Sequence, residues 1–423
     1  MAVAFSVTTT VPRGTTTARN AVPSWKGLEN AIGDPLQQTP PVSIDSVLER
    51  DQSVVFSDKR PTLFRERHGW CPYSERVWLA LEHLNIPYDT VRIDNTGGPR
   101  PSYYSGQTPQ VRWPDGKTQS ESMDLVVAID ERYGNGSLLS NNNDVKELIN
   151  GFRRTFPRNA RPSSRAAFLF RGSGDPLFRS TFEATLEGTN DLLGKNQDGP
   201  FFFGKSFTAA DIAWAPFLER YRYQLPCLHN GLDPYDEEKY PYLAAWYDAM
   251  DTSVPVYSCR VKGDSSSWRK VLQMAGFGNS FIPPDVDGNM DDVIRHEKDT
   301  ALSVVNQQVW DEYASTRPYV AASPQAQAAM VILTNRDAIL TDTMKRTDMW
   351  STTAELDESM RMLVSTLLNN VTDKNEGGIE LDESHVEGVA TLAAFLDERM
   401  CVPRDMGAMS AGCIKSIAVA LGQ

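Results

Sequence analysis

The residue best suited to covalent chemistry is Cys71, which is followed by a proline and then by a helical pattern. Apolar residues recur at the spacing of one helix face, at Val77, Ala80, Leu81 and Leu84, and Pro72 suits the first turn of a helix. Cys71 therefore lies at or just before a helix N-terminus, where unpaired N–H groups and the helix dipole favour a thiolate over a neutral thiol. We expect a nucleophilic sulfur here; the alternative is a buried, inert thiol.

Short strands and helices must position this cysteine. The expected order of elements is strand, helix, strand and then strand, strand, helix. The first two strands are expected over Arg60–Arg67 and Tyr88–Ile93, and a third after Thr108-Pro109-Gln110-Val111. A turn follows at Pro114–Lys117, and Glu121 and Ser122 open the last helix. The Thr108–Pro109 bond is a candidate for the cis form that tight turns use. We therefore predict a small α/β domain over residues 56–136.

Three of these motifs, Cys71-Pro72-Tyr73-Ser74, Thr108–Val111 and Glu121-Ser122, occur together in this order. The stretch resembles the N-terminal thioredoxin-like domain of the cysteine-type glutathione S-transferases, the omega, lambda and dehydroascorbate reductase classes. The resemblance implies that Cys71 faces the sulfur of glutathione, that Val111 pairs backbone to backbone with its cysteinyl part, and that Tyr73, Gln110, Glu121 and Ser122 also contact it. Ser122 can bind a carboxylate at a helix start, and Glu121 can accept from the ammonium.

The resemblance also implies a glutathione-dependent thiol enzyme, with glutathione as co-substrate, no bound cofactor and no metal. Cys71 would attack a mixed disulfide or dehydroascorbate, and a second glutathione would resolve the resulting Cys71–glutathione disulfide. Ser74 stands where a dithiol redoxin has its second cysteine, which favours monothiol chemistry. One alternative is transfer of glutathione to electrophiles, activated by Tyr73. Another is a non-catalytic binding or assembly protein that kept the scaffold.

Residues 140–278 read as helices and are similar to the all-α C-terminal domain of these transferases. Thr208-Ala-Ala-Asp211 is a capping box, so Thr208 and Asp211 are expected to be structural, as is Pro109. Trp214 and Tyr221 on the same helix are candidates for a second-substrate pocket, although the second substrate itself is not indicated.

Two basic features have alternative readings. Arginines cluster between Arg153 and Arg171, at positions 153, 154, 158, 161, 165 and 171; they would attract an anion if they border the cleft, but a solvated loop is the favoured interpretation. His68, three residues before Cys71, would either tune the thiolate or lie at the surface at the end of a strand.

Residues 279–423 form an extension for which we predict helices near 290–315, 323–346, 355–370, 385–400 and 406–421. Leu356, Met360, Leu363 and Leu367 form one apolar stripe, which indicates a core and not a cofactor site. The segment Cys401–Met406 is similar to the C-terminal end of some long transferase-like proteins of cyanobacteria and plastids. The protein is expected either to form a homodimer or to dock to a larger complex through residues 279–423.

The composition of the 423 residues narrows the class of protein. A net charge of −13 argues against nucleic acid as a partner, no apolar run reaches the ~20 residues of a membrane helix, and the five cysteines include no CxxC pair. Residues 1–28 contain no acidic residue and many Ser and Thr, as in a transit peptide. We expect a transit peptide and linker over residues 1–55 and a chloroplast location; a disordered tail on a cytoplasmic protein is the alternative.

Overall fold

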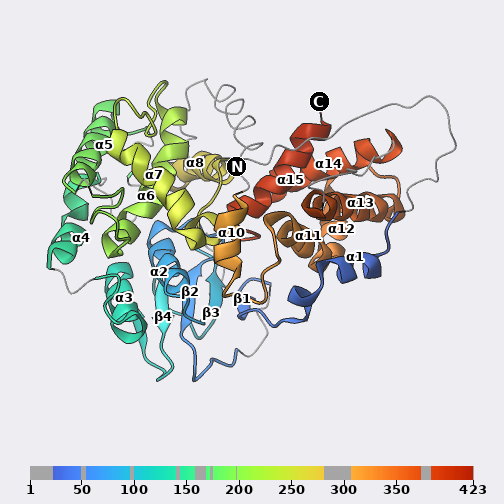
Figure 1. Cartoon of the computed structure of the whole chain (residues 1–423), viewed down its shortest axis with the longest axis horizontal. Helices are drawn as coiled ribbons and strands as arrows, with labels where there is room; N and C mark the ends of the chain where they lie inside the picture. The colour runs from blue at the N-terminus through green and yellow to red at the C-terminus, as the bar shows by residue number, and fades with distance from the viewer. Residues whose placement is uncertain are drawn as a thin grey trace. The chain divides into compact units, whose positions relative to one another are not determined.

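The computed structural model describes residues 22–48, 54–95, 100–139, 143–157, 168–171, 175–196, 198–280, 306–372 and 383–422. The chain divides into two units, one of residues 41–293 and one of residues 1–40 together with 294–423 (Figure 1). Each unit is considered by itself. No helix in these described ranges is long and apolar enough to cross a membrane.

A five-stranded mixed sheet begins the first unit, in the order β1-β3-β2-β4-β5. The strands are β1 (Ser43–Asp45), β2 (Thr62–Glu66), β3 (Asp89–Ile93), β4 (Gln110–Arg112) and β5 (Thr118–Ser120). β3 runs parallel to both β1 and β2, whereas β4 is antiparallel to β2 and β5. The strand–helix–strand and strand–strand–helix order expected from the sequence is confirmed.

The edge strand β1 lies within residues 1–55, for which a transit peptide and linker are predicted and no strand is expected. Ile44 instead pairs with Val91 of β3, and a turn follows only after Asp45. The short alternation of exposed and buried residues in β1 is too brief to separate a strand from a turn by pattern alone.

Two helices pack beside the sheet, α2 (Pro72–His83) and α3 (Ser122–Ile129), the latter continued by a π-turn, η2 (Asp130–Gly134) (Figure 1). Nearly the whole of α2 is buried, because it packs against α3 on one side and against the helical part of the unit on another. The N-terminus of α2 is thus held on a well-packed element.

The helical part of this unit contains α4 (Asn143–Thr155), α5 (Arg179–Gly194), α6 (Ala209–Leu228), α7 (Pro241–Ser253), the π-turn η3 (Tyr257–Val261) and α8 (Ser265–Ser280). α6 is its central helix and packs against α2, α4 and α8. The capping box is present: Ala210 N–H donates to Thr208 Oγ1 at 3.2 Å and Thr208 N–H donates to Asp211 Oδ2 at 2.9 Å. Burial raises the pKa of Asp211 to about 6, and its carboxylate also accepts from Trp246 Nε1.

The second unit is helical, with α1 (Trp25–Ile32), the 3₁₀ turn η1 (Asp34–Gln37), α10 (Gln307–Ala314), α11 (Pro324–Thr334), α12 (Arg336–Arg346), α13 (Thr353–Thr372), α14 (Glu383–Arg399) and α15 (Ala408–Leu421). The predicted stripe of Leu356, Met360, Leu363 and Leu367 is fully buried in its core. The architecture is therefore a thioredoxin-like α/β domain, an all-α domain and further helices, as predicted.

The N-terminal segment corrects one expectation, because a transit peptide and linker are predicted over residues 1–55. Residues 25–32 form α1, capped by Ser24, and Leu28 and Ile32 are buried against α11 and α13. Trp25 Nε1 donates to Asp357 Oδ1 at 2.8 Å. The reason is long-range packing: the partners of α1 lie some 300 residues away in the chain. The expected transit peptide falls mostly on residues 1–21, which lie outside the described residues.

Candidate active site

Cys71 is the N-cap residue of α2, with Pro72 at the first helical position. Its Sγ lies 3.9 Å from the carbonyl oxygen of Thr108, the residue before the cis Thr108–Pro109 bond. The first N–H groups of a helix have no intrahelical partner, so Cys71 lies beside backbone donors that a ligand or substrate can use.

The five cysteines differ in accessibility. Cys71 is partly exposed, whereas Cys227, Cys259, Cys401 and Cys413 are buried. Burial raises the pKa of the Cys413 thiol, which keeps that group protonated. Accessibility and position together single out Cys71 as the cysteine able to react with a molecule from solution.

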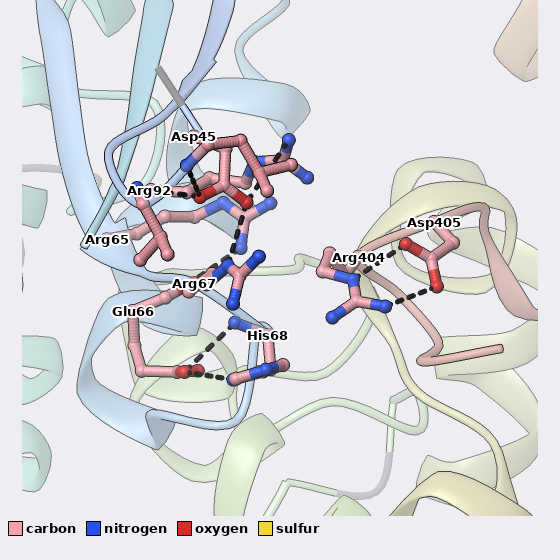
Figure 2. A network of polar contacts seen from close by, with 10 residues as sticks. Asp45, Arg65, Glu66, Arg67, His68, Arg92, Arg404 and Asp405 are labelled. Carbon is pink, nitrogen blue, oxygen red and sulfur yellow. Dashed lines mark hydrogen bonds and ion pairs between the residues drawn. The ribbon is translucent and has the colours of Figure 1, made fainter. Parts of the chain in front are cut away.

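A buried carboxylate braces the loop before Cys71. Glu66 accepts from the backbone N–H groups of His68, at 2.9 Å, and Trp70, at 2.7 Å, and its Oε1 lies 2.9 Å from His68 Nδ1 (Figure 2). Burial raises the pKa of Glu66 but the hydrogen bonds from His68 and Trp70 outweigh it, so the net shift is downward. His68 also stacks on Trp70, with ring centroids 4.4 Å apart.

His68 therefore holds the loop that leads to Cys71. On the other side of the same strand end, Asp45 of β1 binds Arg67 at 2.8 Å and lies near Arg92 (Figure 2). These contacts position the turn from β2 into α2 from the side of the sheet.

The helical part of the unit fixes the same turn from α6. Arg220 forms an ion pair with Glu75 at 2.8 Å, with both side chains buried, and donates to the carbonyl oxygen of Trp70 at 3.0 Å. Its guanidinium also stacks on Trp268 at 4.0 Å. The residue before Cys71 is thus hydrogen-bonded to a helix of the all-α domain.

The turn opposite Cys71 corrects the expected role of Val111. Val111 is at the centre of β4, paired with Leu63 of β2 and with Gln119 of β5, and is fully buried. Because strands flank it on both sides, its backbone cannot pair with a ligand. Thr108, whose carbonyl faces Cys71, is the residue directly before the cis proline, and its place before that proline is the signal in the sequence.

Gln110, at the start of β4, uses its side chain within the protein. Its Nε2 donates to the Ser105 carbonyl at 2.7 Å, and a Cβ at Gly106, where φ is +95°, would lie 2.8 Å from that nitrogen. Gln110 pairs with Ser120 of β5, which precedes Glu121. The pairing of β4 with β5 therefore brings Gln110 and the start of α3 to the same end of the sheet.

Glu121 has φ +71° and ψ +110°, a conformation that costs a non-glycine residue about 1–3 kcal/mol and that clusters at functional sites. Its side chain is exposed, while Ser122, the first residue of α3, is buried. The strained turn thus places an exposed carboxylate beside a helix N-terminus, which suits a ligand carrying both an ammonium and a carboxylate.

Other candidate residues are placed differently. Trp214 and Tyr221 are completely buried, with Tyr221 Oη donating to the Phe168 carbonyl, so both belong to the core and the expectation that they line a pocket is wrong. Tyr73 is 43% exposed on the first turn of α2 and packs edge-on against Phe217 at 5.8 Å.

The arginine cluster is only partly described. Arg153 and Arg154 are exposed in the last turn of α4, and Arg171 pairs with Asp175 at 3.3 Å; positions 158, 161 and 165 lie outside the described residues.

In the described ranges, no group of three or more His, Cys, Asp or Glu is arranged to hold a metal ion.

Comparison with known families matches residues 70–132 to the model described as "Glutathione S-transferase, N-terminal domain" and residues 157–249 to "Glutathione S-transferase, C-terminal domain". The Protein IN2-1 homolog B of Oryza sativa subsp. indica is 31% identical over 180 residues, which cover 40% of this chain and 67% of that protein. The chain belongs to the glutathione S-transferase family.

Two glutathione S-transferases from Arabidopsis thaliana are also similar to the chain. Glutathione S-transferase L2, chloroplastic, is 26% identical over 194 residues, covering 43% of this chain and 60% of that one. Glutathione S-transferase DHAR2 is 28% identical over 159 residues, covering 36% and 66%. Among solved structures, glutathione transferase Omega 3C from Trametes versicolor is similar with a TM-score of 0.35 and 20% identity, over 49% of this chain and 91% of that chain.

The two transferase matches frame the site. The N-terminal match includes Cys71, Thr108, Glu121 and Ser122, and the C-terminal match includes the whole of α6. The described helices of the second unit, from α1 and from α10 to α15, lie outside both matched ranges.

Proposed function

We propose that this glutathione S-transferase is a cysteine-type enzyme, a thiol transferase that reduces mixed disulfides or dehydroascorbate with glutathione as co-substrate. The observation that carries the proposal is Cys71: a partly exposed sulfur at the N-terminus of α2, facing the Thr108 carbonyl across 3.9 Å. The likeness to transferases named L2 and DHAR2 supports the same class of chemistry.

The glutathione site would extend from Cys71 along the edge of β4 to the start of α3. Thr108 would offer its backbone to the cysteinyl part of the tripeptide, and Gln110 and Tyr73 would border it. Glu121 and Ser122 would receive the ammonium and the carboxylate of the γ-glutamyl group. The strained backbone of Glu121 and the N–H groups of α3 support that last assignment.

The reaction consists of two thiol–disulfide exchanges. The Cys71 thiolate attacks the glutathione sulfur of a mixed disulfide, forming a Cys71–glutathione disulfide and releasing the other thiolate. A second glutathione thiolate then attacks the glutathione sulfur of that adduct, releasing oxidised glutathione and the Cys71 thiolate. With dehydroascorbate as acceptor, two glutathiones supply the two electrons and two protons that convert it to ascorbate. Ser74 beside Cys71 offers no second thiol, so glutathione itself must resolve the adduct.

We also propose a plastid location, supported by the acid-free composition of residues 1–28 and by the relative named chloroplastic. Pro23 accepts a hydrogen bond from Arg361 and Trp25 donates to Asp357. Cleavage of a transit peptide would therefore have to leave these residues in place; N-terminal sequencing of the protein purified from plastids tests this.

The first prediction concerns Cys71→Ser, measured with hydroxyethyl disulfide, dehydroascorbate and chlorodinitrobenzene. We expect the first two activities to fall to the rate without enzyme, because the serine hydroxyl stays protonated at neutral pH and forms no disulfide. Cys227→Ser, at a buried cysteine, is the matched control and should keep both activities.

Two other outcomes would favour the alternatives. Conjugation of chlorodinitrobenzene that survives Cys71→Ser but is lost in Tyr73→Phe would indicate the hydroxyl-activated mechanism. Wild-type protein that reduces neither substrate and is not retained on immobilised glutathione would indicate a non-catalytic protein.

A further inference from the structure

A buried positive charge lies directly behind the proposed glutathione site. Arg76, on α2 five residues after Cys71, is only 4% exposed. Its Nε and Nη2 donate to the carbonyl oxygen of Ala213 at 3.0 and 2.7 Å, and its Nη1 donates to Ser122 Oγ at 3.4 Å. These acceptors are neutral, and burying a cation without a counter-charge is costly.

No carboxylate in the described part of the chain lies within ion-pair distance of this guanidinium. Its sequence neighbour Glu75 is paired with Arg220 on α6 instead. Aromatic rings surround the cation, with Phe152 at 4.5 Å, Phe217 at 5.0 Å and Tyr73 at 5.5 Å from it; such contacts offset part of the desolvation cost.

Arg76 nevertheless keeps its charge at neutral pH. Burial lowers its pKa to about 10, and Tyr73 and Cys71 act in the opposite direction. The charge therefore persists, and it interacts electrostatically with Cys71. Such a buried cation favours the binding of a ligand that carries a negative charge.

Ser122 connects this cation to the ligand. Its oxygen accepts from Arg76 Nη1, which leaves the hydroxyl proton to be donated elsewhere, and no acceptor for that proton is found among the described residues. Ser122 also begins α3, where backbone N–H groups have no intrahelical partner. Arg76 thus orients the hydroxyl as a donor at the place where the strained Glu121 turn meets the helix.

We propose that Arg76 is a positioning residue of the glutathione site, which acts through Ser122 to receive the α-carboxylate of the γ-glutamyl group. This rests on the proposed function. The carboxylate accepts from the Ser122 hydroxyl and from the N–H groups of α3, and it supplies the negative charge that the buried guanidinium lacks in the unliganded protein.

A purely structural role is the competing account, because Arg76 also ties α2 to α6 through Ala213. The two accounts predict that different substrates lose activity when Arg76 is replaced. A brace acts on the whole site, whereas a residue that acts through Ser122 affects only substrates with a γ-glutamyl group.

The test compares glutathione with cysteinylglycine, which lacks that group, as reductants of hydroxyethyl disulfide. Wild type, Arg76→Gln, Ser122→Ala and the double variant are assayed, with the exposed Arg346→Gln as a control that removes the same charge. We expect Arg76→Gln to lower the preference for glutathione, as the ratio of kcat/KM values, by about 10-fold or more, mostly through the KM for glutathione. The double variant should be little worse than Ser122→Ala, because both changes remove one interaction.

Equal losses with both reductants, or losses from Arg76→Gln and Ser122→Ala that multiply independently, would overturn the inference. If Arg76→Gln does not fold, Arg76→Lys takes its place: one ammonium cannot span Ala213 and Ser122 as the guanidinium does, so a smaller loss of preference is expected, and an unchanged preference overturns the proposal. Wild-type protein without any glutathione-dependent activity would instead overturn the proposed function, and this inference with it.

Discussion

The two units of the chain bury different kinds of side chain. In the described residues, the buried charged groups of the transferase unit are Asp45, Arg65, Glu66, Glu75, Arg76, Glu82, Asp89, Asp130, Asp211, Glu219 and Arg220, whereas in the helical unit only Arg317 is of this kind. The core of the helical unit is built mainly from Leu, Ile, Val, Ala and Met, together with Trp350 and Cys413.

Buried charge is costly unless it is paired and hydrogen-bonded, so the presence of most buried charged residues in one unit needs a physical explanation. In the transferase unit three of the buried ions hold the elements around Cys71: Glu66 accepts from the Trp70 N–H, Arg220 donates to the Trp70 carbonyl, and Arg76 donates to Ser122. The helical unit has the composition of a packed scaffold. The difference shows where a fixed geometry matters and where apolar burial alone is sufficient.

The largest effect that would sharpen this contrast is expected from Arg220→Met. Removing one partner of a buried ion pair leaves Glu75 uncompensated, so we expect the free energy of unfolding of the transferase unit to fall by about 3–5 kcal/mol. Urea unfolding with hydrogen exchange over α2 and α6 measures it. Arg346→Met, which breaks an exposed pair with Asp342, should cost at most about 0.5 kcal/mol.

Replacing both Glu75 and Arg220 distinguishes the contribution of charge pairing to stability from that of packing. Glu75→Met combined with Arg220→Met should recover much of the lost stability, because an apolar pair of similar volume carries no desolvation cost. If the double variant is as unstable as Arg220→Met alone, packing and not charge pairing explains the loss, and the contrast between the units weakens.

A smaller effect is expected from Leu28→Ala in α1, which tests the scaffold role of the helical unit. Leu28 is buried against α11 and α13, and truncating a buried leucine costs about 2–5 kcal/mol. Hydrogen exchange should therefore increase in α11 and α13 but not in α2, and thiol transfer should be unchanged. Lys26→Ala, on the exposed face of the same helix, is the control. Faster exchange in α2 as well would show that the two units do not behave independently.

Much of this fold follows from local pattern. The periodicity after Cys71, the proline turn at Thr108 and the Thr208–Asp211 cap each act over a few residues, so the helices and strands around them were predicted. What the sequence did not reveal depends on distant partners. α1 is defined by α11 and α13, and the edge strand β1 by β3.

The sequence predicts the candidate site less well where a residue's role depends on partners that are distant in the chain. Val111 was assigned a backbone role that only strand order could exclude, since β2 and β5 occupy both of its sides. Trp214 and Tyr221 have the residue types of a pocket but lie in the core. Arg76 sits in a helical pattern in which a charged residue usually faces solvent, and only the packing of α2 against α6 reveals it as buried.

The most direct test of the proposed chemistry is to detect the covalent Cys71–glutathione disulfide. The protein is mixed with glutathione and hydroxyethyl disulfide, quenched with acid, digested, and analysed by mass spectrometry. The account predicts one glutathione attached by a disulfide to the peptide that contains Cys71, with the peptides of the four buried cysteines unmodified. Glutathione attached only to another cysteine, together with full activity of Cys71→Ser, would contradict it.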